Sequence, residues 1–499
     1  MNLSCRTVAW IVGLGLAPTL AIAQTAPAAP AEPLTFEEAS GLLSKSSDAL
    51  SGASAEVRAA RDQADSLKTL HRPVVSIDAQ VLDYQKTLNL DLGGLKNQAE
   101  GAASGALGAI NATGVPGVPS DVVSAVTSKV QAALPSIFAS IPDSVSLREQ
   151  QTLFHPTVTA VLPIYTGGAI PAAQREAEAA VALAEATQAS AKDMLQVQLV
   201  RAYFGQVLAA QVLAVARDTR DGAQRHLDDA QRLEQQGVLS HARRLEVEVA
   251  RDAAQRNLDQ AEGNYRTAVD ALTDLVHGGG DISPTTGLFV GSASIGPVQP
   301  FLDAAEADHP QLRKAEAGVE AGRQGVKLAQ SQELPAVYAF GEYNLDRRDE
   351  LAVEPDWIFG VGVHYTLMSS IDRHKATSAA REREAAAEAA ERQARVDLRT
   401  NITQAYDLVE TARRQFLSLD SSIAAAREAL RVQEVSFREG EATASEVIDA
   451  RNALGQARTQ RVAAAYEYDL ALAVLLLASG ETERFTDYLH GADRQVAAP

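Results

Sequence analysis

Two carboxylates near the end of the chain, Glu446 and Asp449, come closest to a functional pair by residue type and spacing. Residues three positions apart lie on one face of a helix, so both side chains would point the same way. Such a pair concentrates negative charge and attracts cations. Glu446 also belongs to the pattern Thr443-x-x-Glu446, a capping box that begins a helix. A cap accounts for Glu446 but not for Asp449, so an ion-selecting role and a purely structural role both remain open.

The other reactive residues form no catalytic or metal-binding pattern. Gly278-Gly279-Gly280 is not followed by Lys and then Ser or Thr, so it indicates a helix end and not a phosphate loop. No Gly-x-Ser-x-Gly nucleophile motif occurs. The histidines lack metal-ligand spacing; they are His71, His155, His226, His241, His277, His309, His364, His374 and His490. We therefore predict that the protein is not an enzyme and binds no cofactor and no metal ion.

The N-terminus has the pattern of a secretory signal peptide. Arg6 is the only charged residue before an apolar run that ends at Ile22. Ala21-Ile22-Ala23 provides small residues for cleavage, so we expect residues 1–23 to be removed. The alternative is a membrane anchor, for which the run is short. Cys5 is the only cysteine, so the mature chain would have no disulfide and no thiolate metal site.

The net charge of −19, without a basic block, argues against nucleic-acid binding. Residues 169–235 and 372–436 predict two very long helices, and the second stretch contains no Gly or Pro. At about 1.5 Å per residue each would reach about 100 Å, whereas a globular helix averages about 11 residues. After the first stretch, apolar residues recur mostly three or four positions apart, as in a coiled-coil seam: Leu245, Val249, Leu258, Tyr265, Ala268 and Leu272.

Four segments of about ten residues alternate apolar and polar side chains, as membrane-spanning strands do. Three have regular apolar faces: Val75, Ile77, Ala79 and Val81; Val158, Ala160, Leu162 and Ile164; and Trp357, Phe359, Val361, Val363, Tyr365 and Leu367. The remaining one, Pro335 to Asn344, alternates less regularly. Trp357 and Tyr365 lie near their strand ends, where aromatic residues meet the membrane interface. The alternative is two soluble hairpins packed on helices. No mature segment has the apolar length of a transmembrane helix.

The chain is internally duplicated. A shift of 203 residues places Gly237 on Gly440, and a shift of 262 places Leu50 on Leu312. The difference is an insertion of 59 residues in the first half, at about residues 84–148. Four strands cannot close a membrane barrel, since the smallest have about eight, and open edges are not tolerated in lipid. Strands that span a membrane would therefore be shared among several chains, and three chains would supply twelve.

Several motifs carry a resemblance to a known family. They are Leu334-Pro335, Pro163-Ile164-Tyr165-Thr166-Gly167-Gly168, Gly237-Val238-Leu239-Ser240, Gly440-Glu441-Ala442-Thr443 and Glu446-Val447-Ile448-Asp449-Ala450. Over about residues 35–480 the chain resembles the outer-membrane efflux proteins, the TolC-like channels. The resemblance implies a homotrimer in the outer membrane of a Gram-negative bacterium, with a shared twelve-stranded β-barrel and a periplasmic α-helical tunnel. It implies the exit duct of a tripartite efflux pump or a type I secretion system. A periplasmic adaptor and an inner-membrane transporter of the RND, ABC or MFS class would be its partners.

The expected division of the chain follows the repeats. After the signal peptide come residues 24–71 with the first-half helices, the first membrane hairpin and its insertion at 72–165, and a helical hairpin at 166–277. An equatorial segment and the second-half helix occupy 278–333, the second membrane hairpin 334–368, and the second helical hairpin 369–479. Residues 480–499 form a C-terminal tail.

The resemblance also assigns candidate site residues. Glu446 and Asp449 would form two acidic rings at the periplasmic constriction, and Arg243 and Arg244 are candidates for a latch. The adaptor would contact the turns between the long helices; these residues are Gln236, Gly237, Val238, Leu239, Ser240, Gly440, Glu441, Ala442, Thr443, Ala444 and Ser445.

Two departures from the family pattern and two rival functions remain open. The insertion would be extracellular, as a lid over the pore, a surface shield or a receptor. Arg243-Arg244 stands where the second half has Glu446-Val447. A periplasmic adaptor would also have a signal peptide and a helical hairpin, but only one hairpin, flanked by segments rich in short strands. A secreted coiled-coil structural protein is the other rival.

Overall fold

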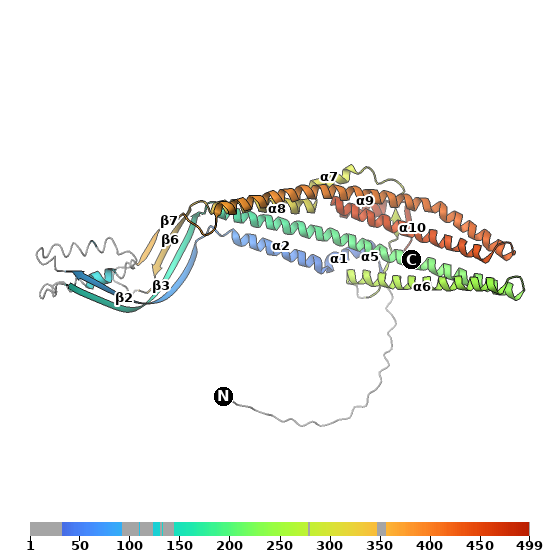
Figure 1. The fold of residues 1–499 in the computed structure, drawn as a ribbon, viewed down its shortest axis with the longest axis horizontal. Coiled ribbons are helices and arrows are strands. Elements are labelled where there is room, and N and C mark those ends of the chain that lie inside the picture. Colours follow the sequence, from blue (N-terminus) through green and yellow to red (C-terminus); the bar gives the residue numbers. More distant parts are fainter. Residues whose placement is uncertain are drawn as a thin grey trace, which may run out of the picture.

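The computed structural model describes residues 32–91, 109, 123–129, 132, 144–277, 280–346 and 356–498. The protein is a long rod with a β-sheet at one end and helices along the remainder (Figure 1). The expected signal peptide and most of the insertion lie outside the described residues, so the roles predicted for them stay predictions. Within the insertion, residues 123–129 are helical.

Four long helices make up most of the rod. They are α5 (Ala169–Gln235), α6 (His241–Val276), α9 (Arg373–Arg438) and α10 (Ala444–Ser479). α5 and α6 form one hairpin and α9 and α10 the other, with both turns at the end opposite the sheet (Figure 1). The helices contain 67 and 36 residues in the first hairpin and 66 and 36 in the second, so the two halves are nearly equal. A periplasmic adaptor was expected to have one hairpin, and this chain has two.

Shorter helices complete a single-layered wall. Beside the sheet, α2 (Asp48–Leu67) packs on α5, and α8 (Pro310–Ser331) packs on both α5 and α9. Toward the far end, α6 packs on α5, and α10 packs on both α5 and α9. The order across the wall is therefore α2–α5–α8–α9 beside the sheet and α6–α5–α10–α9 farther away. α2 and α6 form one edge of the wall, and α9 forms the other.

Alanine explains how these helices are both long and closely packed. On α5, four of the buried positions in the half nearer the sheet are alanines: Ala172, Ala177, Ala179 and Ala186. Alanine is the strongest helix former, and its small side chain lets helix axes approach. α5 and α10 each contain an 18-residue window apolar enough to cross a membrane, so the sequence-based exclusion of such helices was too strict. About half of each window is buried, 44% and 56%, as expected for helices that pack within a wall.

One antiparallel sheet forms the other end of the rod. Its strands are β2 (Val74–Asp91), β3 (Ser144–Tyr165), β6 (Ala336–Asn344) and β7 (Trp357–His364), in the order β2–β3–β6–β7. Directly opposed residues share a face, so the register assigns every side chain to one of two faces. One face is apolar and exposed; its large residues include Val75, Ile77, Val81, Phe154, Tyr343, Trp357, Phe359, Val361 and Val363. This division is the one predicted from the alternation.

Two strands are longer than predicted. The expected length was about ten residues, but β2 has 18 and β3 has 22. Their ladder continues to the pair Asp91 and Ser144, so the first and last residues of the predicted insertion belong to the hairpin. Residues 84–91 include no Gly or Pro, and continued pairing satisfies backbone groups that would otherwise need other partners. At the other edge, β7 ends at His364, so Tyr365 lies just beyond the strand.

Small elements surround the middle of the wall. β1 (Glu32–Leu34) pairs with β4 (Ile282–Pro284), and β5 (Leu288–Val290) pairs with β8 (Arg494–Val496). α1 (Phe36–Ser46), α7 (Gln299–Asp308), the 3-10 helix η1 (Thr482–Arg484) and α11 (Phe485–Gly491) complete this region. Rings from segments distant in sequence meet there: Phe36 lies 5.3 Å from Phe204 and 5.2 Å from Phe485, between ring centroids. The cluster therefore joins α1, near the start of the described residues, and α11, near their end, to α5.

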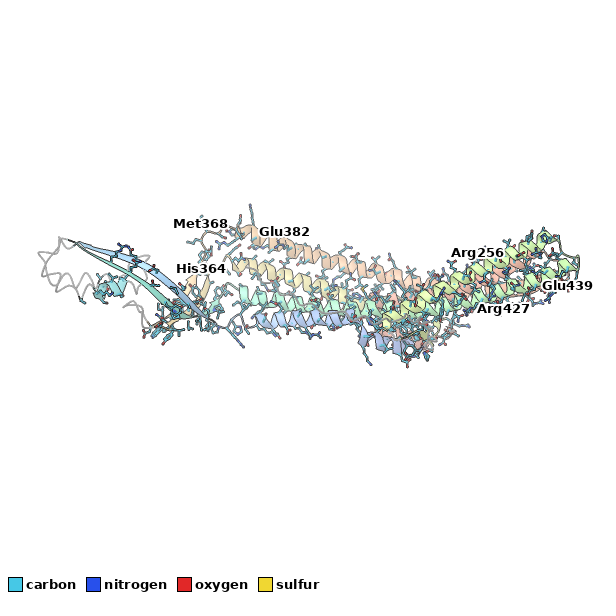
Figure 2. The ribbon with its side chains drawn as sticks, turned by 90° about the horizontal axis from the view of Figure 1, so that it is seen from below. Arg256, His364, Met368, Glu382, Arg427 and Glu439 are labelled. Carbon is cyan, nitrogen blue, oxygen red and sulfur yellow. The ribbon has the colours of Figure 1, made fainter. Side chains whose placement is uncertain are left out.

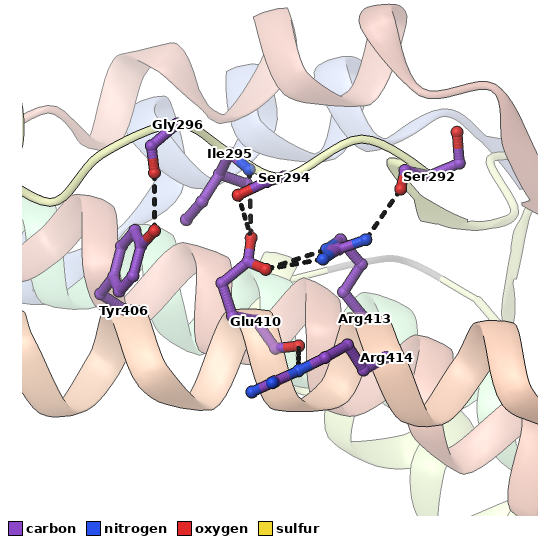
Figure 3. Close-up of polar contacts among 8 residues, drawn as sticks. All are labelled: Ser292, Ser294, Ile295, Gly296, Tyr406, Glu410, Arg413 and Arg414. Atoms are coloured by element: carbon purple, nitrogen blue, oxygen red, sulfur yellow. Dashed lines mark hydrogen bonds and ion pairs between the residues drawn. The ribbon is translucent and has the colours of Figure 1, made fainter.

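Polar contacts fasten the segment before α7 to α9 (Figure 3). Glu410 accepts hydrogen bonds from Oγ of Ser294 at 2.9 Å and from the backbone N–H of Ile295 at 3.1 Å. Arg413 pairs with Glu410 at 2.8 Å and donates to the carbonyl of Ser292. Burial opposes ionisation of Glu410, but the hydrogen bonds from Arg413 and Ser294 outweigh it and lower the pKa of Glu410. The segment is therefore tied to α9 by a charged carboxylate.

Candidate functional site at the helical hairpin ends

Both hairpins end in the same backbone turn. Gly237 has φ 74° and Gly440 has φ 80°, in the left-handed region that favours glycine. After each glycine the chain bonds back to the last helical turn: Val238 N–H donates to the Leu233 carbonyl at 2.9 Å, and Glu441 N–H donates to the Ser436 carbonyl at 2.8 Å. This pattern is a Schellman helix end. Glu439, which caps α9, marks this end of the rod in Figure 2, opposite His364 and Met368 beside the sheet.

The helix after the second turn begins with a complete capping box. The backbone N–H of Thr443 donates to Glu446 at 2.6 Å, and the Glu446 N–H donates to Oγ1 of Thr443 at 3.3 Å. Both hydrogen bonds from Thr443 lower the pKa of Glu446; the bond from the backbone contributes most, and the bond from the hydroxyl contributes less. Glu446 is therefore an exposed, charged carboxylate with its position held by the turn.

Asp449 lies one helical turn farther on and is also exposed. Within the described ranges it makes no hydrogen bond or ion pair, so its carboxylate faces outward from the protomer without compensation. The two carboxylates share a face of α10, as the spacing predicts.

The two arginines predicted as latch residues contact their own hairpin. Arg244 is 16% exposed; its Nε lies 2.8 Å from Glu234 of α5, and it also pairs with Glu248 of α6. Arg243 pairs with Glu246 at 3.1 Å on α6. Neither arginine is paired with Glu446 or Asp449 in the described part of the protomer. Arg244 thus joins the two helices of the first hairpin next to its turn.

A different arginine, which the sequence analysis missed, lies between the two hairpins. Arg451 of α10 pairs with Glu434 of α9 and is 14% exposed. Its guanidinium lies directly against Gly222 of α5, where any Cβ atom would overlap it. Gly222 lies within the uninterrupted helix α5 and, having no side chain, leaves room for Arg451. No spacing rule relates these residues, because they lie on three different helices.

His226 is the other missed residue. Its imidazole lies edge-on to Phe437 of α9, with 4.5 Å between ring centroids, and is 7% exposed. Burial, followed by the charge of Arg451, lowers the pKa of His226; the Ala444 backbone and Asp229 oppose this shift. The histidine borders an apolar cluster that joins all four long helices: Leu227, Ala230, Val247, Leu430, Phe437, Ala444, Val447 and Leu454. This cluster holds the two hairpins together at their ends.

Among the described residues, no group of three His, Cys, Asp or Glu side chains could hold a metal ion. The hairpin ends therefore offer charge, turns and packing, which suit a passage or a docking surface.

At the opposite end of the rod, the aromatic residues predicted for the membrane interface are exposed. Trp357 is 58% exposed at the start of β7, and Tyr365 is 50% exposed just after its end.

Comparison with known proteins supports a channel. A family model described as outer membrane efflux protein matches residues 128–278 and 301–481. The chain is 28% identical to Protein CyaE of Bordetella pertussis over an alignment of 195 residues. This alignment covers 37% of this chain and 40% of that protein. The chain thus spans less than half the length of this curated relative.

Solved structures show the same fold. VceC of Vibrio cholerae, an outer membrane protein, has a TM-score of 0.66 and 15% identity, covering 89% of this chain and 96% of VceC. The Campylobacter jejuni CmeC outer membrane channel has a TM-score of 0.67 and 12% identity, covering 92% and 90%. The open state of the Neisseria gonorrhoeae MtrE outer membrane channel has a TM-score of 0.67 and 14% identity, covering 90% and 89%.

Proposed function

Because the chain belongs to the outer membrane efflux protein family, we propose that it is the outer-membrane exit duct of a tripartite efflux pump or a type I secretion system. The duct is passive: substrates enter from a periplasmic adaptor and an inner-membrane transporter and leave through the barrel. The transporter, of the RND, ABC or MFS class, supplies the energy. The membership agrees with the resemblance stated from the sequence motifs.

The open edges of the protomer support a homotrimer. Among the strands that the structure describes, the sheet ends at β2 on one side and β7 on the other, and each of these edge strands has a single partner. Unpaired strand edges are costly in lipid, so β7 of one chain pairs with β2 of the next until the barrel closes. The helical edges carry exposed apolar residues for the same contact: Leu245 and Val249 on α6, and Val396, Leu408 and Val432 on α9.

The hairpin turns are the proposed adaptor contacts. Residues 236–240 and 440–445 lie at the end of the rod away from the membrane sheet (Figure 1). Val238 is 64% exposed although it is apolar, which fits a docking surface. In the trimer the two turns alternate around the tunnel entrance, so six turns meet the hairpins of the adaptor.

The tunnel entrance is the proposed gate. Glu446 and Asp449 of three chains form two stacked acidic rings that favour cations over anions. Arg243 and Arg244 are proposed to help hold the closed state. The pairing of Arg244 with Glu234 suggests that it does so by stiffening its own hairpin.

One observation carries the proposal. A four-stranded sheet with an apolar outer face continues directly into two long helical hairpins, and the sheet and the helical wall are open along the same two sides.

The adaptor contact can be tested with a single introduced cysteine, since Cys5 is the only natural one and lies in the expected signal peptide. We expect Val238→Cys to form cross-links with a periplasmic adaptor in intact cells. Leu183→Cys, at an exposed position near the sheet end of α5 and far from the turn, is the matched control. Equal cross-linking from both positions, or none from Val238→Cys in active channels, would contradict the adaptor contact.

A further inference from the structure

Two aromatic rings lie on the polar face of the membrane sheet. The register places Tyr338, Phe340 and Glu342 of β6 on the face that carries Ser76 and Thr159, opposite the more apolar face. The same face also carries Val161, opposite Phe340, and Ile358, opposite Glu342. A membrane barrel turns its apolar face to lipid and its polar face to the lumen. Both rings therefore face the lumen, where contact with lipid does not explain them. They are also the reason why this strand alternates less regularly in sequence.

Glycines on the neighbouring strand let both rings lie against the sheet. Tyr338 is opposite Gly362, and Phe340 is opposite Gly360. A Cβ atom on Gly362 would lie 2.6 Å from Cζ of Tyr338, and one on Gly360 would lie 3.2 Å from the ring of Phe340. A residue with a side chain would displace these rings. Each ring therefore rests one side on the β7 backbone and leaves its other side toward the lumen.

An acidic residue lies on the same face of β6 as the two rings. The centroids of Tyr338 and Phe340 are 6.1 Å apart, with 49° between the ring planes. Glu342 follows two residues later on the same face and is exposed. Within the part of the chain that the structure describes, Glu342 has no hydrogen bond or ion pair. An aromatic face attracts cations through its quadrupole, and a carboxylate attracts them by its charge.

We propose that Tyr338, Phe340 and Glu342 form a binding site for aromatic organic cations in the barrel lumen. A planar cation stacks on the free face of one ring, contacts the tilted second ring and places its positive charge toward Glu342. The inference rests on the proposed function, because the lumen exists only in the assembled channel, where the site occurs once per chain. The site gives the barrel its own preference among substrates, in addition to the selectivity of the transporter.

Aromatic rings packed on glycine also stabilise sheets, so the test needs a readout that sheet packing alone does not move. Ethidium, a planar aromatic cation, is titrated into the detergent-solubilised full-length channel and followed by fluorescence polarisation. We expect Tyr338→Leu with Phe340→Leu to weaken ethidium binding by about tenfold, the size expected for two cation–π contacts. Tyr338→Phe keeps the ring and should preserve the affinity. Glu342→Gln should weaken ethidium binding but leave a neutral aromatic dye unaffected.

Two further variants separate binding from folding. Gly362→Ala pushes the Tyr338 ring off β7 and should weaken ethidium binding in a channel whose own aromatic residues are all present. Tyr343→Leu removes a ring from the opposite face of the same strand and should leave ethidium binding unchanged. Native mass is measured for every preparation. Trimers in which the double variant binds ethidium like the parent, or in which Tyr343→Leu causes the same loss, would overturn the binding site alone. A folded monomer would instead overturn the proposed function and, with it, the lumen.

Discussion

Glu446 and Asp449 differ in what holds them. Glu446 bonds to the backbone and hydroxyl of Thr443, which keeps it charged and fixes its position. Asp449 has no such partner in the described protomer. The capping role that the sequence predicted for Glu446 is thus present, and it does not exclude a gate, since a helix start that borders an aperture presents its cap residue there. The gate itself stays a prediction.

Neutral variants that keep the cap test the gate. Glu446→Gln preserves the capping box, because Gln serves at this position as Glu does, and Asp449→Asn preserves the shape of the side chain. The double variant removes six carboxylates from the proposed rings, so the reversal potential under a salt gradient should shift toward zero in planar bilayers. Glu428→Gln, an exposed carboxylate on α9, is the control. An unchanged reversal potential in the double variant would mean that the constriction lies elsewhere.

His226 predicts a pH dependence of the hairpin ends. Burial keeps the imidazole neutral and lowers its pKa below 6.5, so the unfolded chain binds a proton at a higher pH than the folded one. The stabilising contribution is complete above about pH 6.5 and decreases as the pH falls toward the folded pKa. Lowering the pH from 7.5 to 5.5 slows the chemical exchange of amide hydrogens, so hydrogen exchange in residues 222–234 and 434–447 should slow less than the chemical rate does.

His226→Phe is the matched variant, because it keeps a ring against Phe437 and removes the titrating group. Its hairpin ends should lose this extra pH dependence, whereas His309, another buried histidine with a lowered pKa, retains its own contribution near α8. The same pH dependence in both proteins at the hairpin ends would show that His226 is not the group responsible.

At the scale of elements, the sequence predicted the helices better than the strands. Gly168 before α5 and Gly440 after α9 mark helix boundaries locally, so both long helices lie close to the predicted ranges. The lengths of β2 and β3 depend on pairing between residues that are 53 to 87 positions apart, which alternation within one strand cannot reveal. The contact of Arg451 with Gly222 was missed for the same reason, since it joins helices from different halves of the chain.

The two hairpin turns favour glycine because of their backbone conformation, and not because a side chain would lack space. No atom lies within 4 Å of a Cβ atom built on Gly237 or Gly440, so a larger residue is opposed only by the left-handed φ, at about 1–2 kcal/mol. Gly237→Val and Gly440→Val should therefore leave the assembled channel intact but distort the turns that the adaptor contacts. We expect drug efflux, measured as resistance in a strain that lacks other channels, to be lost.

Gly296→Val is the control for this prediction. Gly296 has φ 93° with no atom near its Cβ position, but it lies in the segment fastened to α9, far from the hairpin ends. It imposes comparable strain without touching the adaptor surface, so efflux should persist. Normal resistance in Gly237→Val and Gly440→Val cells, at parental channel levels in the outer membrane, would remove the turns from the adaptor interface.

At the scale of the molecule, the protomer is a strip that is incomplete along both sides. Among the described strands, β2 and β7 each leave their outer edge unpaired, and the helical wall ends at α2 and α6 on one side and at α9 on the other. The sequence predicted the open sheet edges, because four strands are too few to close a membrane barrel. The number of copies that close the wall is set by curvature, which no single strand or helix encodes.

The most direct test of the exit duct is therefore the native mass of the mature protein extracted from outer membranes in detergent. A barrel shared among three chains predicts a single species with the mass of three protomers, found in the outer-membrane fraction and soluble only with detergent. The strands should be folded in that species. A stable monomer with folded strands, or a trimer that is soluble without detergent, would contradict a shared membrane barrel and with it the proposed duct.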